Sequence, residues 1–209
     1  MVITYHGGEC FKVSFGDTTL AFNPISKDSK LKGTKFGSTI VLVSLNHPDM
    51  NGVDAASFGD KQPFVVSGPG EYEIQGVTVK GFASKSQYGG DHLNTVYFAT
   101  LEGMNLCFLG ALGIPDLPQE AKQELDDIDV LFVPIGGGGV LDYAEGYKLA
   151  VKLEPKLVIP MHYGEIGTKD ALTSFLKEAG AEGTKPEEKL TIKKKDLEGK
   201  EVEVVVLSQ

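Results

Sequence analysis

Cysteine, long apolar runs and positive charge are all scarce in this sequence. No window of the 209 residues reaches the roughly 18 uncharged apolar residues that a membrane-spanning helix needs. The first residues, MVITYHGGECFKV, lack the basic segment and the apolar segment of a secretory signal peptide. We therefore expect a cytoplasmic protein that does not enter a membrane.

Only two cysteines are present, Cys10 and Cys107. Each stands among apolar residues that are typical of a strand, and their separation matches no zinc-binding or redox motif. We expect both to be small buried side chains rather than partners in a disulfide.

Acidic residues outnumber basic ones, and the formal net charge is -9. Binding to nucleic acid or to an anionic membrane requires lysines and arginines that neutralise phosphates. The one basic run, residues 193–195, is typical of the solvated end of a hairpin. The composition therefore disfavours nucleic acid and membranes as partners, and leaves a small molecule or another protein.

The composition is that of an ordinary globular protein, with 41% hydrophobic and 23% charged residues. The chain contains no internal repeat, low-complexity segment or linker-like stretch. Its length suffices to bury a core without disulfides. We expect a single domain over residues 1–209.

The first hundred residues alternate between short β-like runs and turn residues. The spacing predicts two hairpins, one around Gln75-Gly76 and one around Gly103. At each of these turns, a strand-like run ends shortly before the turn and another begins shortly after it. We therefore expect an antiparallel sheet in this half. The predicted strands cover residues 11–15, 19–22, 41–44, 64–67, 71–74, 77–80, 95–100 and 105–109.

In the second half, strand-like runs alternate with helical patterns, which is typical of a mixed α/β layer. Pro118 marks the first turn of one helix. Asp142 and Glu145 have the spacing of a capping box at the start of a second. Thr168 is a candidate N-cap for a third. The last strand-like runs, 190–193 and 202–207, predict a closing hairpin.

The run IVLVSLNHPDMNG, residues 40–52, ends a buried strand and continues into an irregular turn. His47 and Asp49 lie two residues apart on that turn and could face one cavity. An imidazole and a carboxylate together suit zinc, manganese or iron. Because His-x-Asp also occurs by chance, a purely structural turn is the open alternative.

The run from 130 to 164 predicts a strand, a turn, a helix and a second strand, with His162 just past the end of that strand. Successive backbone N–H groups ahead of a helix could bind an anionic group of a substrate. A turn that needs positive φ explains the same run equally simply. The turn consists of four glycines, Gly136, Gly137, Gly138 and Gly139.

These segments resemble the metallo-β-lactamase superfamily, in particular the branch of ascorbate-phosphate lactonase-like small metal-dependent hydrolases. The runs VPIGG (133–137) and VIPMHYG (158–164) are the most specific part of the resemblance, which extends over almost the whole chain. It implies an α+β fold, a four-layer αββα sandwich, with two metal ions along one sheet edge.

Several ligand positions depart from the superfamily pattern. The first and last histidines of its His-x-His-x-Asp-His motif fall on Leu45 and Met50, and its bridging aspartate falls on Ala111. A further histidine falls near Ser84. A hydrocarbon, a thioether and a methyl group cannot replace imidazoles and a carboxylate as ligands. The resemblance therefore implies a fold without its dinuclear centre.

Three of the implied ligands remain, namely His47, Asp49 and His162, and two hypotheses follow. The first is a non-catalytic protein with a binding role and no cofactor. The second is a hydrolase of a small ester, lactone or phosphoester that uses one zinc or manganese ion, with Asp49 as ligand or as general base. His6 or His92 could join such a site, although a turn or surface position is the simpler interpretation of each.

Overall fold

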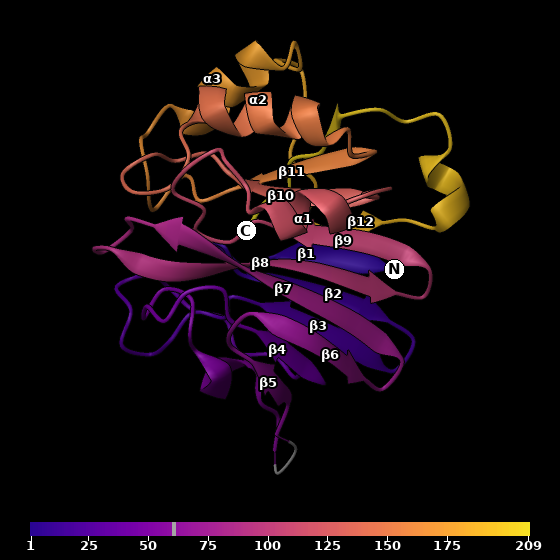
Figure 1. Ribbon diagram of the computed structural model, residues 1–209. Helices are drawn as coiled ribbons and strands as arrows, with labels where there is room; N and C mark the ends of the chain where they lie inside the picture. Colours follow the sequence, from indigo (N-terminus) through magenta and orange to yellow (C-terminus); the bar gives the residue numbers. More distant parts are fainter. Residues whose placement is uncertain (60–61) are drawn as a thin grey trace.

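The computed structural model describes residues 1–59 and 62–209, and its strands form two β-sheets packed face to face (Figure 1). The first sheet has the order β12-β1-β2-β3-β4-β5, and the second has the order β13-β11-β10-β9-β8-β7-β6. In the part of the chain that is described, no helix is both long and apolar enough to cross a membrane.

The first sheet is built mainly from the N-terminal quarter of the chain. Antiparallel pairing joins β12, β1, β2 and β3, whereas β4 and β5 add to β3 in parallel. Within this sheet, the expectation of an antiparallel first half is therefore confirmed for β1, β2 and β3 and wrong for the parallel pairings of β4 and β5. The strands are β1 (Val2–Tyr5), β2 (Phe11–Phe15), β3 (Thr18–Phe22), β4 (Ile40–Leu42), β5 (Phe64–Val66) and β12 (Leu190–Thr191).

The second sheet confirms both predicted hairpins, β6–β7 and β8–β9. At each hairpin tip two successive residues have positive φ: Gln75 (53°) and Gly76 (80°), then Glu102 (51°) and Gly103 (73°). Such turns match the twist of the flanking strands. The strands are β6 (Gly70–Ile74), β7 (Val77–Ser86), β8 (His92–Leu101), β9 (Met104–Phe108), β10 (Val130–Pro134), β11 (Leu157–Met161) and β13 (Glu203–Val204).

The main core lies between the two sheets, because alternate side chains of each strand point inward. Aromatic rings from both sheets meet there. The centroid of Phe22 in β3 lies 4.7 Å from that of Phe108 in β9, and the centroid of Phe11 in β2 lies 4.8 Å from that of Phe132 in β10. These contacts fix the two sheets against each other, and so fix the edge at which the loops after β4 and β11 lie.

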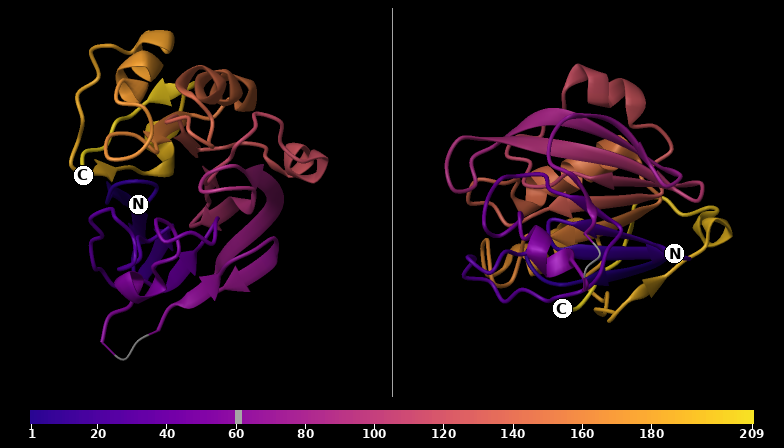
Figure 2. Two further views of the ribbon diagram at one scale, coloured as in Figure 1. Left: turned by 90° about the vertical axis from the view of Figure 1, so that its left-hand side faces the viewer. Right: turned by 90° about the horizontal axis from the view of Figure 1, so that it is seen from below.

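Helices cover the outer face of the second sheet, opposite the indigo N-terminal strands in the left view of Figure 2. They are α1 (Gln119–Glu124), α2 (Tyr143–Leu153) and α3 (Ala171–Glu178). Only one short 3-10 helix, η1 (Val53–Ala56), packs on the outer face of the first sheet in the described structure. The expected αββα sandwich is therefore confirmed as an α+β fold, with a thin outer layer on one side.

Local signals in the second half had mixed outcomes. The capping box of Asp142 and Glu145 is present at the start of α2, and Pro118 is the residue before α1. Thr168 does not cap α3: the N-cap is Asp170, and the Thr168 backbone N–H donates to the Gly136 carbonyl at 2.9 Å. The backbone of Thr168 is thus held by a hydrogen bond to a distant turn, and the helix begins after Asp170 instead.

The predicted C-terminal hairpin is wrong. Strand β12 pairs with β1 of the first sheet, whereas β13 pairs with β11 of the second. The lysines of residues 193–195 therefore do not close a hairpin; η2 (Lys194–Leu197) follows β12. Each short run completes a different sheet edge, which sequence spacing alone does not encode. The two cysteines are buried and free, as expected.

A buried carboxylate ties this C-terminal segment to the second sheet. Asp129 is fully buried, and its two oxygens accept hydrogen bonds from Lys156 (2.7 Å) and from the Asn105 backbone N–H (2.8 Å). Lys194 of η2 donates to it as well, at 2.5 Å. Hydrogen bonds to the two carboxylates Asp127 and Asp129 raise the pKa of Lys156, so this lysine stays charged.

Removing this carboxylate should destabilise the protein. We expect Asp129→Ala to lower the free energy of unfolding by about 2–3 kcal/mol, because it removes charge-assisted hydrogen bonds from a buried site. Asp116→Ala is the matched control, since Asp116 pairs with Lys122 on the exposed surface and should contribute far less. Urea unfolding measures both, and equal losses would contradict this account.

Candidate functional site

Side chains from distant segments meet at one edge of the two sheets. Asp49 and His47 lie in the loop after β4, and His162 follows β11 directly. The turn between β1 and β2 supplies Glu9, and the loop between β7 and β8 supplies Tyr88. The three ligands predicted from the sequence all contact Tyr88, which surrounds one aromatic side chain with two imidazoles and a carboxylate.

A fully buried pair, Glu9 and His162, anchors the site. The Oε1 atom of Glu9 lies 2.7 Å from Nδ1 of His162, and neither side chain reaches solvent. The φ angle of His162 is 60°, which is unusual for a residue with a Cβ atom, and its backbone N–H donates to the Gly8 carbonyl at 2.8 Å. Sequence patterns alone do not single out Glu9, although an acidic residue in the apolar run GECFKV is a signal of a buried carboxylate.

Amide and hydroxyl groups extend this buried polar network beneath the site. Asn23 donates through Nδ2 to Glu9 Oε2 and to Ser44 Oγ, both at 2.8 Å, and its Oδ1 accepts from the Ser44 backbone N–H at 2.8 Å. A separate buried amide, Asn94, accepts from the Ala111 backbone N–H at 3.0 Å. The network satisfies buried polar groups that would otherwise be costly.

Both oxygens of the Asp49 carboxylate accept hydrogen bonds. The Tyr88 hydroxyl donates to Oδ2 at 2.6 Å, and the Ser29 hydroxyl donates to Oδ1. Nδ1 of His47 lies 3.5 Å from Oδ2. Burial, together with the hydrogen bond to Asp49, raises the pKa of Tyr88, so the phenol remains a protonated donor at neutral pH.

The Tyr88 ring fills the space between the two predicted histidine ligands. Its centroid lies 4.9 Å from that of His47 and 4.7 Å from that of His162, both in edge-on geometry. The ring also packs against a small cluster of buried apolar side chains. That cluster consists of Leu45, Met50, Ala111 and Val140. Three of these four stand at positions where the resemblance implies metal ligands.

As arranged, these side chains do not fit a metal ion. Within residues 1–59 and 62–209, no group of three or more His, Cys, Asp and Glu side chains is placed to hold one. The Asp49 oxygens are engaged, and a phenol separates the two imidazoles. One feature does suit a metal: Nε2 of His162 is buried and lacks a hydrogen-bond partner among the described residues. A carboxylate on the other ring nitrogen commonly orients histidine ligands.

The two additional histidines lie in different surroundings. His6 stacks on Phe36 with centroids 4.7 Å apart, and burial lowers its pKa, so it serves local packing. His92 is exposed at the start of β8. A Cβ atom built on Gly89 would lie 3.0 Å from Nε2 of His47 and 4.0 Å from Nε2 of His92. His92 therefore flanks the rim of the site. The position expected for another histidine, Ser84, hydrogen-bonds Asn94 instead.

Of the four glycines predicted to bind substrate, the first and the last are tightly packed. A Cβ atom on Gly136 would lie 2.0 Å from the carbonyl oxygen of His162, and one on Gly139 would lie 2.6 Å from the backbone nitrogen of Tyr88. Positive φ values of 66°, 66° and 112° occur at Gly137, Gly138 and Gly139. These observations agree with the turn interpretation, and anion binding by this run stays a prediction.

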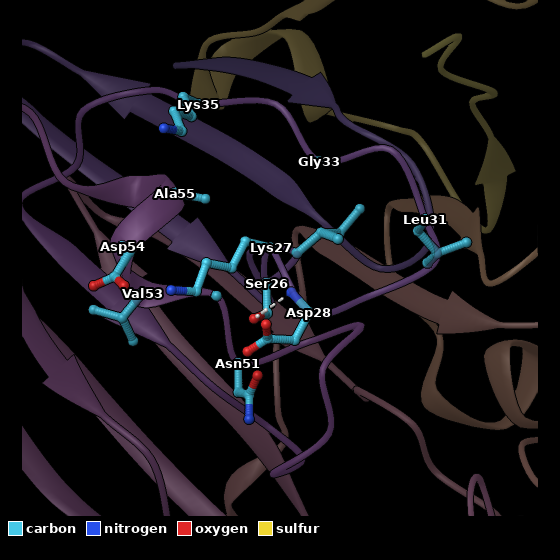
Figure 3. Close-up of a pocket in the computed structure, with 12 residues that line it drawn as sticks. Ser26, Lys27, Asp28, Leu31, Gly33, Lys35, Asn51, Val53, Asp54 and Ala55 are labelled. Carbon is cyan, nitrogen blue, oxygen red and sulfur yellow. Dashed lines mark hydrogen bonds between the residues drawn. The ribbon is translucent and has the colours of Figure 1, made fainter.

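Two neighbouring clefts lie at this edge of the sheets. The first, about 680 Å³, has His47, Asp49 and Tyr88 in its wall. The second, about 550 Å³, lies between residues 25–35 and 51–55 (Figure 3). Asp28 and Leu31 line both clefts, so a ligand in the second cleft could extend to the site.

Both signs of charge occur in the wall of the second cleft. Lys27 and Lys35 contribute positive charge, and Asp28 and Asp54 contribute negative charge. In Figure 3 the Lys27 side chain extends toward Asp54, while Asp28 lies beside Asn51. The cleft is therefore suited to a polar ligand rather than to a hydrocarbon.

Comparisons with known proteins agree with this architecture. Residues 2–162 match the family model described as the β-lactamase superfamily domain. A UPF0173 metal-dependent hydrolase from Listeria innocua is 29% identical over 195 residues, which cover 78% of this chain and 85% of that one. A Thermotoga maritima structure, described as a Zn-dependent hydrolase of the metallo-β-lactamase superfamily, aligns with a TM-score of 0.76 and 28% identity, covering 99% and 97% of the two chains. A metallo hydrolase from Ignicoccus hospitalis, at 20% identity and a TM-score of 0.64, covers 92% of this chain and 99% of its own.

The Glu9–His162 pair should be essential to stability. We expect Glu9→Ala to lower the free energy of unfolding by about 3–5 kcal/mol, because it leaves a buried imidazole and a buried amide without their partner. Glu9→Gln keeps the shape and one acceptor oxygen, so it should cost clearly less. The exposed His92→Ala change is the control and should stay within about 0.5 kcal/mol. Denaturant unfolding decides, and a Glu9→Ala protein as stable as wild type would refute the assignment.

Proposed function

This chain belongs to the metallo-β-lactamase superfamily, and from that premise we propose that it is a metal-independent binding protein rather than a hydrolase. Within the superfamily we propose kinship with the ascorbate-phosphate lactonase-like branch, on the runs at 133–137 and 158–164. Its relatives are described as metal-dependent hydrolases, so we propose that this chain keeps their fold but not their metal-dependent activity.

One observation supports the proposal above all others. The space between His47, Asp49 and His162 contains the ring of Tyr88, and the apolar side chains of Leu45 and Met50 are buried beside it. A catalytic zinc needs about three protein ligands and an open position for water. Neither is available while the phenol lies between the imidazoles.

We propose that the ligand is a small polar molecule that binds in the second cleft. The cleft volume of about 550 Å³ lies in the usual range for small-molecule sites, and its lysines and carboxylates offer partners for both acidic and basic groups. The net charge of -9 disfavours nucleic acid as the partner. We also propose a cytoplasmic location.

A mononuclear hydrolase is the second candidate. The observation in its favour is the free Nε2 of buried His162, oriented by Glu9 as metal-bound histidines commonly are. On this view one zinc or manganese ion would be held by His47, Asp49 and His162, and would supply a polarised water for attack on an ester, lactone or phosphoester. The Tyr88 side chain would have to leave for such an ion to bind.

Metal content separates the two candidates. We expect wild-type protein, incubated with zinc or manganese and then desalted, to retain less than about 0.1 equivalent, because a stable site needs more free donors than this one offers. Hydrolysis of ester, lactone and phosphodiester substrates should be unchanged by His162→Ala. Elemental analysis and these assays provide the measurement. One tightly held equivalent that His162→Ala removes, together with the activity, would establish the hydrolase instead.

A further inference from the structure

One side chain, Tyr88, makes contact with every predicted metal ligand that this chain retains. Its hydroxyl donates to Asp49 at 2.6 Å, and its ring lies 4.9 Å from the His47 ring and 4.7 Å from the His162 ring, measured between centroids. These three residues come from two loops that are more than one hundred positions apart in the sequence. A single ion bound by all three would need the same central position.

We propose that the Tyr88 side chain takes the place of a metal ion in this protein, and that it covers a latent site for one transition-metal ion. This inference rests on the proposed function, since it explains how the fold keeps its shape at this edge without a metal. The phenol links Asp49 to the two histidines, a task that an ion would otherwise perform, and its ring completes the apolar cluster at Leu45 and Met50.

The loop that carries Tyr88 is shaped to seat this side chain. The Gln87 backbone N–H donates to the Gly139 carbonyl at 3.0 Å, and the Tyr88 backbone N–H donates to the Ser86 hydroxyl at 3.2 Å. A Cβ atom on Gly139 would collide with the Gln87 and Tyr88 backbones at 2.6 Å, so the glycine permits this close approach. Gly89 similarly leaves room for the His47 ring, which a Cβ atom there would approach to 3.0 Å.

The groups under the ring are those that a zinc or cobalt ion prefers. His162 offers an unpartnered Nε2 atom and is held by Glu9 through Nδ1. Asp49 would regain a free carboxylate oxygen if the phenol left, and His47 would face the vacated space. Two imidazoles and one carboxylate form a recurring catalytic zinc set, with Zn–N distances of about 2.0–2.1 Å.

The experiment compares Co²⁺ binding by wild type and by Tyr88→Ala. Cobalt is followed by its visible absorption, and bound metal is counted by elemental analysis after desalting. We expect Tyr88→Ala to bind one equivalent and the double variant Tyr88→Ala/His47→Ala, which keeps the buried Glu9–His162 pair, to bind none. Circular dichroism and thermal unfolding establish that each variant is folded. Tyr88→Ser is made in parallel, so that a poorly folded alanine variant can be replaced.

A phenylalanine variant tests which part of the side chain excludes the ion. Tyr88→Phe keeps the ring and loses only the hydrogen bond to Asp49, so it should fold and remain free of Co²⁺. Binding by Tyr88→Phe as tight as by Tyr88→Ala would overturn the claim that the ring occupies the position of the ion. Equal binding by Tyr88→Ala and the double variant would overturn the assignment of the ligands.

The two proposals fail in different ways. Metal-free wild type with metal-free, folded Tyr88→Ala or Tyr88→Ser would overturn the latent site and leave the proposed function intact. Metal bound by wild type through His162 would overturn the proposed function. That result would also overturn the claim that Tyr88 takes the place of the ion, whereas the first result overturns the latent site alone.

Discussion

The contact between Tyr88 and Asp49, with the phenol ring between two imidazoles, is the constraint on which the site depends. It joins the loop after β7 to the loop after β4 and covers His162 at the end of β11. The side chain joins these segments by one hydrogen bond and by edge-on ring contacts.

The layer beneath Tyr88 is polar, although the Tyr88 ring itself packs against buried apolar side chains. Glu9, Asn23 and Ser44 form a buried chain of hydrogen bonds that ends at His162. A buried carboxylate and imidazole are costly unless each is satisfied, and such networks rigidify their surroundings when they are complete. The network therefore explains how this sheet edge keeps its geometry although the neighbouring side chains of Leu45, Met50 and Ala111 are apolar.

Much of the fold could be predicted from local chemistry. Turn residues around Gln75-Gly76 and Gly103 located both hairpins, and the pair Asp142 and Glu145 located the start of α2. The C-terminal hairpin failed because β12 and β13 each pair with a different sheet, a long-range choice that short Val-rich or Leu-rich runs do not specify. Of the site, His47, Asp49 and His162 lie where strand ends suggested. The sequence did not identify Glu9 or Tyr88, because neither belongs to a motif. Each contacts its partner, His162 or Asp49, only because the fold brings distant segments together.

The central claim is that a phenol ring, rather than a metal ion, lies between His47 and His162. Crystals of the wild-type protein soaked in zinc, with diffraction recorded on both sides of the zinc absorption edge, test it directly. The account predicts density for the Tyr88 ring within hydrogen-bond distance of Asp49 and no anomalous peak between the two imidazoles. An anomalous peak there, with Tyr88 displaced from the site, would contradict it.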